Sequence, residues 1–325
     1  MKKKIYLFAT ILTATAVLFL SSCLKDNAHY INFNTGTTFV DFPLGGFVNY
    51  STDAITETPD TDANGTIVRQ FAVNVASANL PTKPTVVKLA VGDQADLDAI
   101  NKLQTNVTYV MMPSNAYSFT TTTVTIPAGQ QYVTTSVTFY KNLLDPSQSY
   151  VLPIKIVSGT GAQLTANLNI HYFHFIGNDF AGAYTWDYYR YNAATVLPTP
   201  SGGTALGQAG TAVPVSPTEF TVITGYNGQG VRYDVNFTRT VVSGVPMYSN
   251  FTVAFVPSDV TGIWAPSTIS VLGGPNFYSV HTSNNAPLFD PAGPLTKAQA
   301  EQIFCFQYLA YNGSADRYII DDYHH

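Results

Sequence analysis

The sequence predicts an all-β protein made of sandwiches or barrel-like sheets, because apolar and polar residues alternate through short runs that turn residues separate. In Val231–Phe237 every odd position is apolar and every even position is polar, which predicts an antiparallel strand with one buried face. The same alternation occurs in 67–75, 133–139, 150–156 and 251–255, and turn residues stand at 127–129, 145–147, 159–161 and 225–228.

Helical periodicity is scarce. One short helix is expected in 95–103, where Leu97, Ile100 and Leu103 would share a face. A second is expected from Thr296, because Gln299 three residues later makes a capping-box spacing. Neither helix is long enough to organise a domain.

The first 23 residues carry an export signal. Lys2, Lys3 and Lys4 precede an apolar run that ends at Leu20, and Leu20-Ser21-Ser22-Cys23 follows the pattern of a bacterial lipoprotein signal. The run is shorter than the roughly 20 residues that span a bilayer. We therefore expect a signal peptide at 1–22, acylation of Cys23, and a lipidated tether at 23–34.

Composition limits the partners. Charged residues make up 11% of the chain and its net charge is −5, and no basic cluster remains once the signal with Lys2, Lys3 and Lys4 is removed, which argues against nucleic acid as a partner. The second cysteine, Cys305, lies between Phe304 and Phe306, a setting typical of an inert buried thiol.

The domain boundary is expected near residue 177. A last strand of the first unit ends at Ile176, Gly177-Asn178-Asp179 is a turn signal, and a new aromatic run starts at Phe180. The predicted units are residues 35–176 and 177–325.

Residues 85–158 carry a family resemblance. The segments Val124–Gly129 (VTIPAG) and Leu144–Ile156 (LDPSQSYVLPIKI) are its most specific parts, and the likeness covers roughly residues 30–175. In these segments the chain resembles the Bacteroidetes surface lipoproteins that begin with domain of unknown function 1735 (DUF1735).

The resemblance implies an Ig-like β-sandwich at 35–176, a smaller β-rich domain at 177–325, and lipid anchoring at the surface of the outer membrane. It also implies an outer-membrane transporter or a glycan-binding lipoprotein as partner, since such proteins are often encoded with carbohydrate-uptake systems. Some relatives continue into a glycosidase, but the second unit is too short for a (β/α)₈ barrel, which takes about 250 residues.

No catalytic, cofactor or metal set stands out, so we expect a protein that is not an enzyme. The acidic residues of the second unit form no pair with the spacing that glycosidases need. His171 and His174 are three apart in an expected strand, so they face opposite sides and cannot share one ion.

Aromatic residues give the candidate ligand site. The chain has 21 Tyr and 20 Phe but only 2 Trp. Alternation in 184–191 puts Tyr184, Trp186, Tyr188 and Arg190 on one face and Asp187, Tyr189 and Tyr191 on the other.

One face must be core, and the other would either expose rings for a sugar or be covered as well. The candidate binding residues are therefore Trp186, Asp187, Tyr188, Tyr189 and, in a loop-like Gly-Ile-Trp-Ala-Pro run, Trp264.

The function expected from the sequence is non-catalytic glycan binding, or assembly, within a polysaccharide-uptake system. The alternative is a structural or adhesion lipoprotein that binds a protein partner, for example by adding a strand to a sheet edge.

Overall fold

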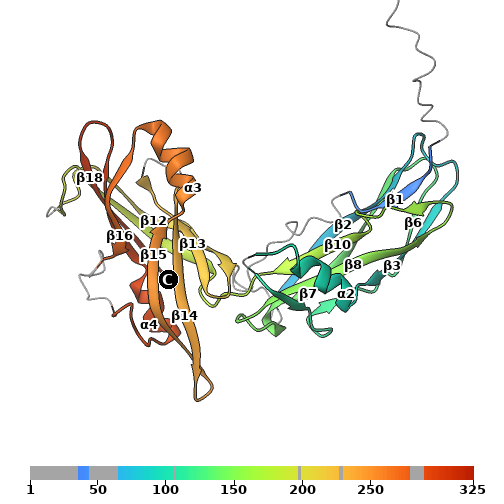
Figure 1. The fold of residues 1–325 in the computed structure, drawn as a ribbon, viewed down its shortest axis with the longest axis horizontal. Helices are drawn as coiled ribbons and strands as arrows, with labels where there is room; N and C mark the ends of the chain where they lie inside the picture. The colour runs from blue at the N-terminus through green and yellow to red at the C-terminus, as the bar shows by residue number, and fades with distance from the viewer. Residues whose placement is uncertain (1–35, 44–64, 106, 197–198, 227–229, 279–288) are drawn as a thin grey trace, which may run out of the picture.

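The computed structural model describes residues 36–43, 65–105, 107–196, 199–226, 230–278 and 289–325. The predicted signal peptide, Cys23 and the predicted tether lie outside these ranges. Within them, two sets of strands follow each other along the chain: β1–β10 form two sheets, and β11–β18 form a third (Figure 1). The all-β class is confirmed.

The first set is a sandwich. One sheet has the order β5 (Tyr117–Ser118), β7 (Tyr132–Tyr140), β2 (Thr66–Ala76), β1 (Phe39–Asp41) and β9 (Gln163–Leu164). The other has the order β10 (Ile170–Phe175), β8 (Ser149–Gly159), β3 (Thr85–Val91) and β6 (Thr123–Ile126), and β4 (Tyr109–Met111) also pairs with β8. Alternate residues of both sheets bury one core, as in Phe71, Val73 and Val75 of β2 facing Leu152 and Ile154 of β8.

The helix predicted in this set is confirmed as α2 (Gln94–Asn101). Asp93 caps it by accepting from the backbone N–H groups of Ala95 and Asp96, and the Asp96 side chain accepts in return from the Asp93 N–H. Leu97 and Ile100 are its buried residues, and a 3₁₀ turn (Lys141–Leu143) follows β7.

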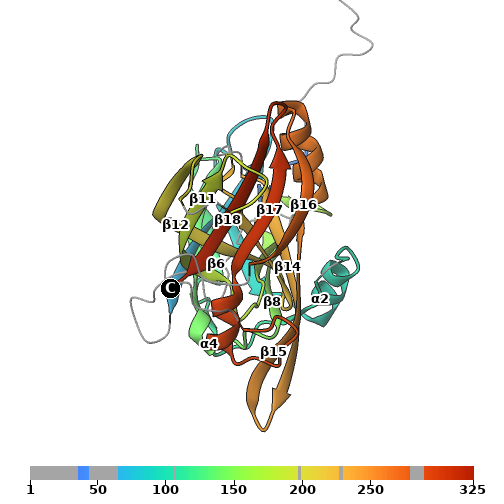
Figure 2. The same cartoon turned by 90° about the vertical axis from the view of Figure 1, so that its left-hand side faces the viewer.

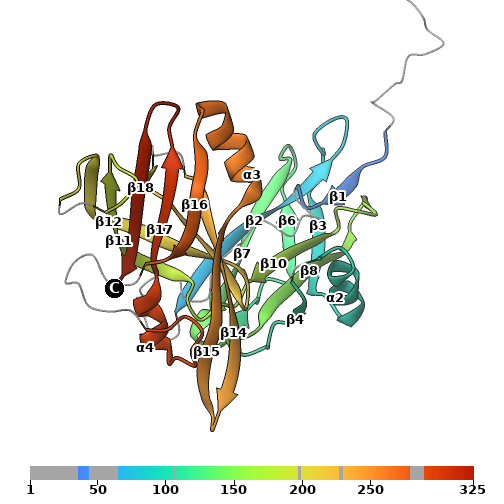
Figure 3. The ribbon, with the colours of Figure 1, turned by 60° about the vertical axis from the view of Figure 1, so that its left-hand side comes forward.

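The second set is one eight-stranded antiparallel sheet that curves on itself. Its order is β15 (Val245–Phe255), β14 (Arg232–Val242), β13 (Glu219–Ile223), β12 (Gly203–Ser216), β11 (Gly182–Tyr191), β18 (Asp316–His324), β17 (Cys305–Tyr311) and β16 (Ser270–Phe277). The two edge strands, β15 and β16, come close to each other, so the sheet is nearly closed into a barrel (Figure 3). Figure 2 shows β11, β18, β17 and β16 side by side along one wall.

An aromatic core fills the inner side of this curved sheet. The alternation predicted for 231–237 is confirmed, because Val231, Tyr233, Val235 and Phe237 are all buried there. The rings meet mostly edge to face, the arrangement that aromatic pairs prefer.

Short helical segments cover the ends of the sheet. The predicted second helix is confirmed as α4 (Lys297–Ala300), with the capping box of Thr296 and Gln299, and a 3₁₀ turn (Glu301–Ile303) continues it. A helical segment that alternation did not predict runs through α3 (Pro257–Asp259), Val260–Trp264 and Ala265–Ser267. Among the described residues, no helix combines the length and apolar character that crossing a bilayer requires.

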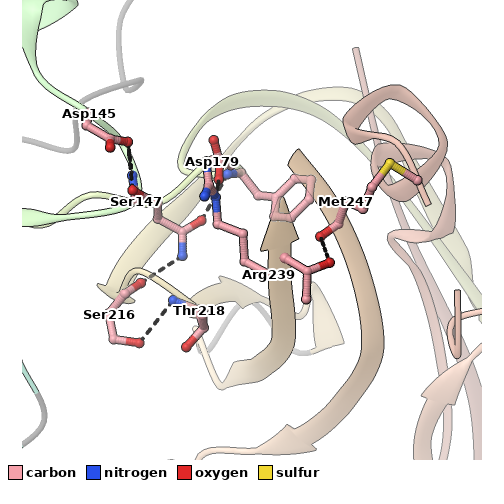
Figure 4. A network of polar contacts seen from close by, with 10 residues as sticks. Asp145, Ser147, Asp179, Ser216, Thr218, Arg239 and Met247 are labelled. Carbon is pink, nitrogen blue, oxygen red and sulfur yellow. Dashed lines mark hydrogen bonds and ion pairs between the residues drawn. The ribbon is translucent and has the colours of Figure 1, made fainter. Parts of the chain in front are cut away.

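Residues 176–181, which join β10 to β11, contact strands or loops of both sets. A Cβ at Gly177 would lie 2.1 Å from the Gln148 carbonyl oxygen, so only glycine fits there. The buried Asn178 side chain donates to the carbonyls of Ser216 and Glu219, and Asp179 forms an ion pair with Arg239 of β14 at 2.6 Å (Figure 4). The boundary predicted at residue 177, as a limit between independently folding units, stays a prediction.

Candidate functional site

Strand β11 carries four of the five predicted binding residues, and its alternation is as predicted. Tyr184 and Tyr188 belong to the inner core, and Trp186 packs against it. Tyr191 is buried in a small cluster on the outer face, and Tyr189 packs against that cluster. Both faces of β11 are thus covered to a large extent, and only Trp186 and Tyr189 among the predicted binding rings are partly exposed.

The expectation of an exposed ring is wrong for Trp264. Its exposed fraction is 0%, and its ring packs against Phe255, Tyr308 and Tyr226 with centroid distances of 4.9, 5.6 and 6.2 Å. Trp264 lies in the helical segment between β15 and β16 rather than in a loop, and that segment turns the indole inward. A sugar cannot stack on this ring without rearrangement of the core.

Asp187 has a local partner for each carboxylate oxygen. Its Oδ1 accepts from the Gly207 N–H at 2.7 Å, and its Oδ2 lies 3.4 Å from His324 Nε2. Gly207 has a φ of +63° at a bulge in β12, a conformation that suits glycine. Asp187 is 8% exposed, so this carboxylate mainly holds the bulge in place.

A buried carboxylate that sequence reasoning missed lies inside the curved sheet. Asp321 of β18 accepts from Trp186 Nε1 at 3.0 Å, from the Tyr233 hydroxyl at 2.6 Å and from the Gly225 N–H at 3.1 Å. Burial raises its pKa to about 6, although these hydrogen bonds oppose the rise. The network ties three distant segments of the domain to one side chain.

The partly exposed rings gather on the outer face of β11 and β18. We call Tyr189, Tyr191, Tyr278 and Tyr318 the tyrosine patch; Tyr191 is buried at its base and the other three rings are half-buried. The rings of Tyr191 and Tyr318 are 6.4 Å apart at an angle of 71°, and the Tyr318 hydroxyl donates to the Gln307 side chain. The patch combines apolar ring surface with hydroxyl and amide groups.

Cys305 lies under this patch. It is fully buried, and burial raises the pKa of its thiol well above the ordinary value, with the nearby Asp322 carboxylate adding to the rise. The prediction of a buried thiol is confirmed, and a group that stays protonated is a poor nucleophile.

Two carboxyl groups of the curved sheet can be compared with the catalytic pair of a glycosidase. Glu219 and Asp234 lie on the neighbouring strands β13 and β14, and burial together with the Asp234 charge raises the pKa of Glu219. Glycosidases hold their two carboxyl groups about 5–9.5 Å apart so that a sugar bond fits between them. A side-chain hydrogen bond between Glu219 and Asp234 adds to the rise in that pKa, so these two carboxyl groups lie closer together than that spacing.

The two histidines of β10 point to opposite faces, as predicted. His171 packs among Phe42, Phe71 and Phe173, whereas His174 Nδ1 lies 2.7 Å from the Tyr109 hydroxyl. Burial lowers the pKa of both imidazoles to about 4, so they stay neutral. In the part of the chain that the structure describes, no three His, Cys, Asp or Glu side chains are grouped to hold a metal ion.

Comparison with protein families gives one match, in the N-terminal part of the chain. Residues 26–163 match the model of a family of N-terminal domains, described as "-like, N-terminal domain". No curated protein matches the chain.

Solved structures with a similar chain trace come from Bacteroides. A multidomain protein including DUF1735, from Bacteroides ovatus, is 14% identical with a TM-score of 0.34, covering 89% of this chain and 93% of that one. An auxiliary nutrient binding protein from Bacteroides thetaiotaomicron is 14% identical with a TM-score of 0.32, covering 91% and 93%. A proposed carbohydrate binding protein from Bacteroides ovatus is 14% identical with a TM-score of 0.35, covering 66% and 67%.

Proposed function

We propose that this chain, whose residues 26–163 match a family of N-terminal domains, is a DUF1735-type, non-catalytic glycan-binding lipoprotein of the outer membrane. In this proposal the lipid on Cys23 holds the chain at the cell surface, and the C-terminal sheet binds the glycan. Partners would be the transporter or glycan-binding lipoprotein of a polysaccharide-uptake system.

The tyrosine patch is the observation that carries the proposal. A tyrosine ring offers an apolar face with a polar hydroxyl, which matches the apolar C–H faces and hydroxyl rim of a sugar. Tyr189 and Tyr318 stand on the paired strands β11 and β18, so a rigid sheet fixes the position of their rings. Of the residues predicted from sequence, Tyr189 belongs to this patch, whereas Trp186 and Tyr188 face inward.

Replacing Tyr189 by alanine should lower glycan affinity at least about tenfold, because a stacking surface is lost. The free energy of unfolding should change by only about 1 kcal/mol, the scale of changes outside a core. The measurement is a glycan-array screen of the full chain in detergent, followed by titration calorimetry with each glycan that binds.

The matched control is Tyr132→Ala, which removes a ring that is 59% exposed on the N-terminal sandwich. Equal affinity in the two variants would remove the site assignment. An array on which no glycan binds would instead favour the alternative, a lipoprotein that binds a protein partner.

Replacing Cys23 by alanine should release the chain from membranes, because the signal run is too short to span the bilayer and acylation would be lost. The measurement is membrane fractionation of cells that produce the variant. Cys305→Ala is the matched control, since that buried thiol should leave attachment unchanged. Full membrane retention of the Cys23 variant would contradict lipid anchoring.

A further inference from the structure

Two arginines approach each other at one end of the curved sheet. Arg190 of β11 pairs in register with Ile319 of β18, and Ile319 belongs to the inner core. Residues directly opposite in an antiparallel pair share a face, as do residues two apart in one strand. Arg190 and Arg317 therefore both lie on the inner face, at the end where β18 begins.

The positive charges of both arginines reach Tyr226. The Tyr226 side chain is 1% exposed, and its ring lies 6.2 Å from that of Trp264. Burial raises the pKa of the Tyr226 hydroxyl, and the Arg317 and Arg190 guanidinium groups oppose that rise. The two cations thus act on the same buried hydroxyl.

Neither arginine has an acidic partner among the described residues. Two other arginines of the same domain do: Arg232 pairs with Asp259 and Arg239 with Asp179. Arg317 donates to the carbonyl of its neighbour Asp316, and the buried Arg190 Nε has no acceptor. Both arginine residues are partly exposed, and two neighbouring cations without an acidic partner stand out in a chain whose net charge is −5.

Further donors without acceptors lie at the same end. The Tyr188 hydroxyl is buried, with its side chain 8% exposed, and has no hydrogen-bond partner of good geometry although the Arg190 guanidinium lies beside it. The Trp264 Nε1 is also buried without an acceptor. Buried polar groups in folded proteins are nearly always paired, so a group of unpaired donors needs an explanation.

We propose that this arginine end, formed by the partly exposed Arg190 and Arg317 beside the buried Tyr188 and Tyr226, binds an acidic group of a glycan, either a uronic acid carboxylate or a sulfate ester. Both groups only accept hydrogen bonds, and the planar guanidinium fork fits their oxygens two at a time. The inference rests on the proposed glycan binding and gives the class of glycan, an acidic polysaccharide.

The test is titration calorimetry on the full chain in detergent with three probes. Unsulfated chondroitin carries carboxylates, κ-carrageenan carries sulfate without carboxylate, and dextran is neutral. The variants are Arg190→Gln and Arg317→Gln, and the charge-matched control is Arg69→Gln on the N-terminal sandwich. Arg317→Gln keeps the test usable if Arg190→Gln does not fold, and circular dichroism checks each variant.

We expect one of the two acidic probes to bind, with an affinity at least about tenfold lower in each arginine variant and unchanged in Arg69→Gln. The probe that binds tells carboxylate from sulfate. An equal loss in all three variants would mean general charge attraction and would overturn the inference. Dextran binding that requires Tyr189, without any effect of Arg190 or Arg317, would overturn the inference and leave the proposed function standing. Binding of none of the probes, with an array on which no glycan binds, would remove both.

Discussion

Replacing Trp264 by alanine should destabilise the C-terminal domain by about 3–5 kcal/mol, the cost of removing a large aromatic side chain from a packed core. The ring is fully buried and contacts three other aromatic residues, so its removal leaves a cavity that they cannot fill without moving. The measurement is urea unfolding followed by circular dichroism and by fluorescence of the remaining tryptophan, Trp186.

Phenylalanine at the two tryptophan positions provides the control. Trp264→Phe should be the milder change, because Trp264 Nε1 has no acceptor to lose. Trp186→Phe removes a hydrogen bond to the buried Asp321 and should cost more than its lost ring area alone. A Trp264→Ala chain that unfolds like the unchanged protein would contradict the buried position of this ring.

Local pattern was enough to predict several of the strands and both capped helices. Strand β14 follows the alternation at Val231–Phe237, and α4 starts at the capping box of Thr296 and Gln299. These signals reside in a few consecutive residues, so a single sequence contains all of the information that they need.

The candidate site depended on contacts that local pattern does not contain. Alternation shows which residues share a face, but it does not show what covers that face. The Trp264 ring is buried because the helical segment 257–267 packs it onto Phe255 and Tyr308.

Asp321 illustrates the same limit. It lies in the run Ile319-Ile320-Asp321-Asp322, where alternation puts it on the inner face with Ile319. Its three donors lie 88 to 135 residues away along the chain, in β11, in β14 and just after β13. No spacing in the sequence brings those segments together.

The two features that would bind a ligand share one end of β11. Tyr189 and Tyr191 face outward there, and Tyr188 and Arg190 face inward. The Asp321 network lies deeper on the inner side, where it holds Trp186 and Gly225. Because Gly225 directly precedes Tyr226, loss of that carboxylate would disturb the arginine end as well as the core.

Replacing Asp321 by asparagine should change how stability depends on pH. Burial gives Asp321 a pKa of about 6 in the folded chain, against an ordinary value of 3.8. A carboxyl group with a raised pKa favours folding in its protonated form, so its contribution is complete below about pH 4 and is lost as the pH rises to about 6. Two pKa units correspond to about 3 kcal/mol of unfolding free energy.

The asparagine variant has no proton to lose in this range. Relative to the unchanged chain, Asp321→Asn should therefore gain about 2–3 kcal/mol of stability between pH 4 and pH 7. The ionisable groups that feel the Asp321 charge include Tyr233, Tyr188, Tyr308, Tyr323 and the Cys305 thiol, and burial raises the pKa of each. They do not titrate in this range, so the difference between the two curves isolates Asp321. The measurement is urea unfolding at half-unit pH steps, and parallel curves would contradict a raised pKa.

Alanine at the same position tests the hydrogen bonds rather than the charge. Asp321→Ala leaves the donors Trp186 Nε1, Tyr233 Oη and the Gly225 N–H buried without an acceptor. Each such group costs about 1–3 kcal/mol, so the loss should reach several kcal/mol at every pH. Asparagine keeps one oxygen that can accept from Trp186 Nε1 and the Gly225 N–H, and its NH₂ group can donate to the Tyr233 hydroxyl, whereas alanine offers neither group. A large alanine loss beside a stable asparagine variant would therefore show that Asp321 is retained for its acceptor geometry, while its charge opposes folding.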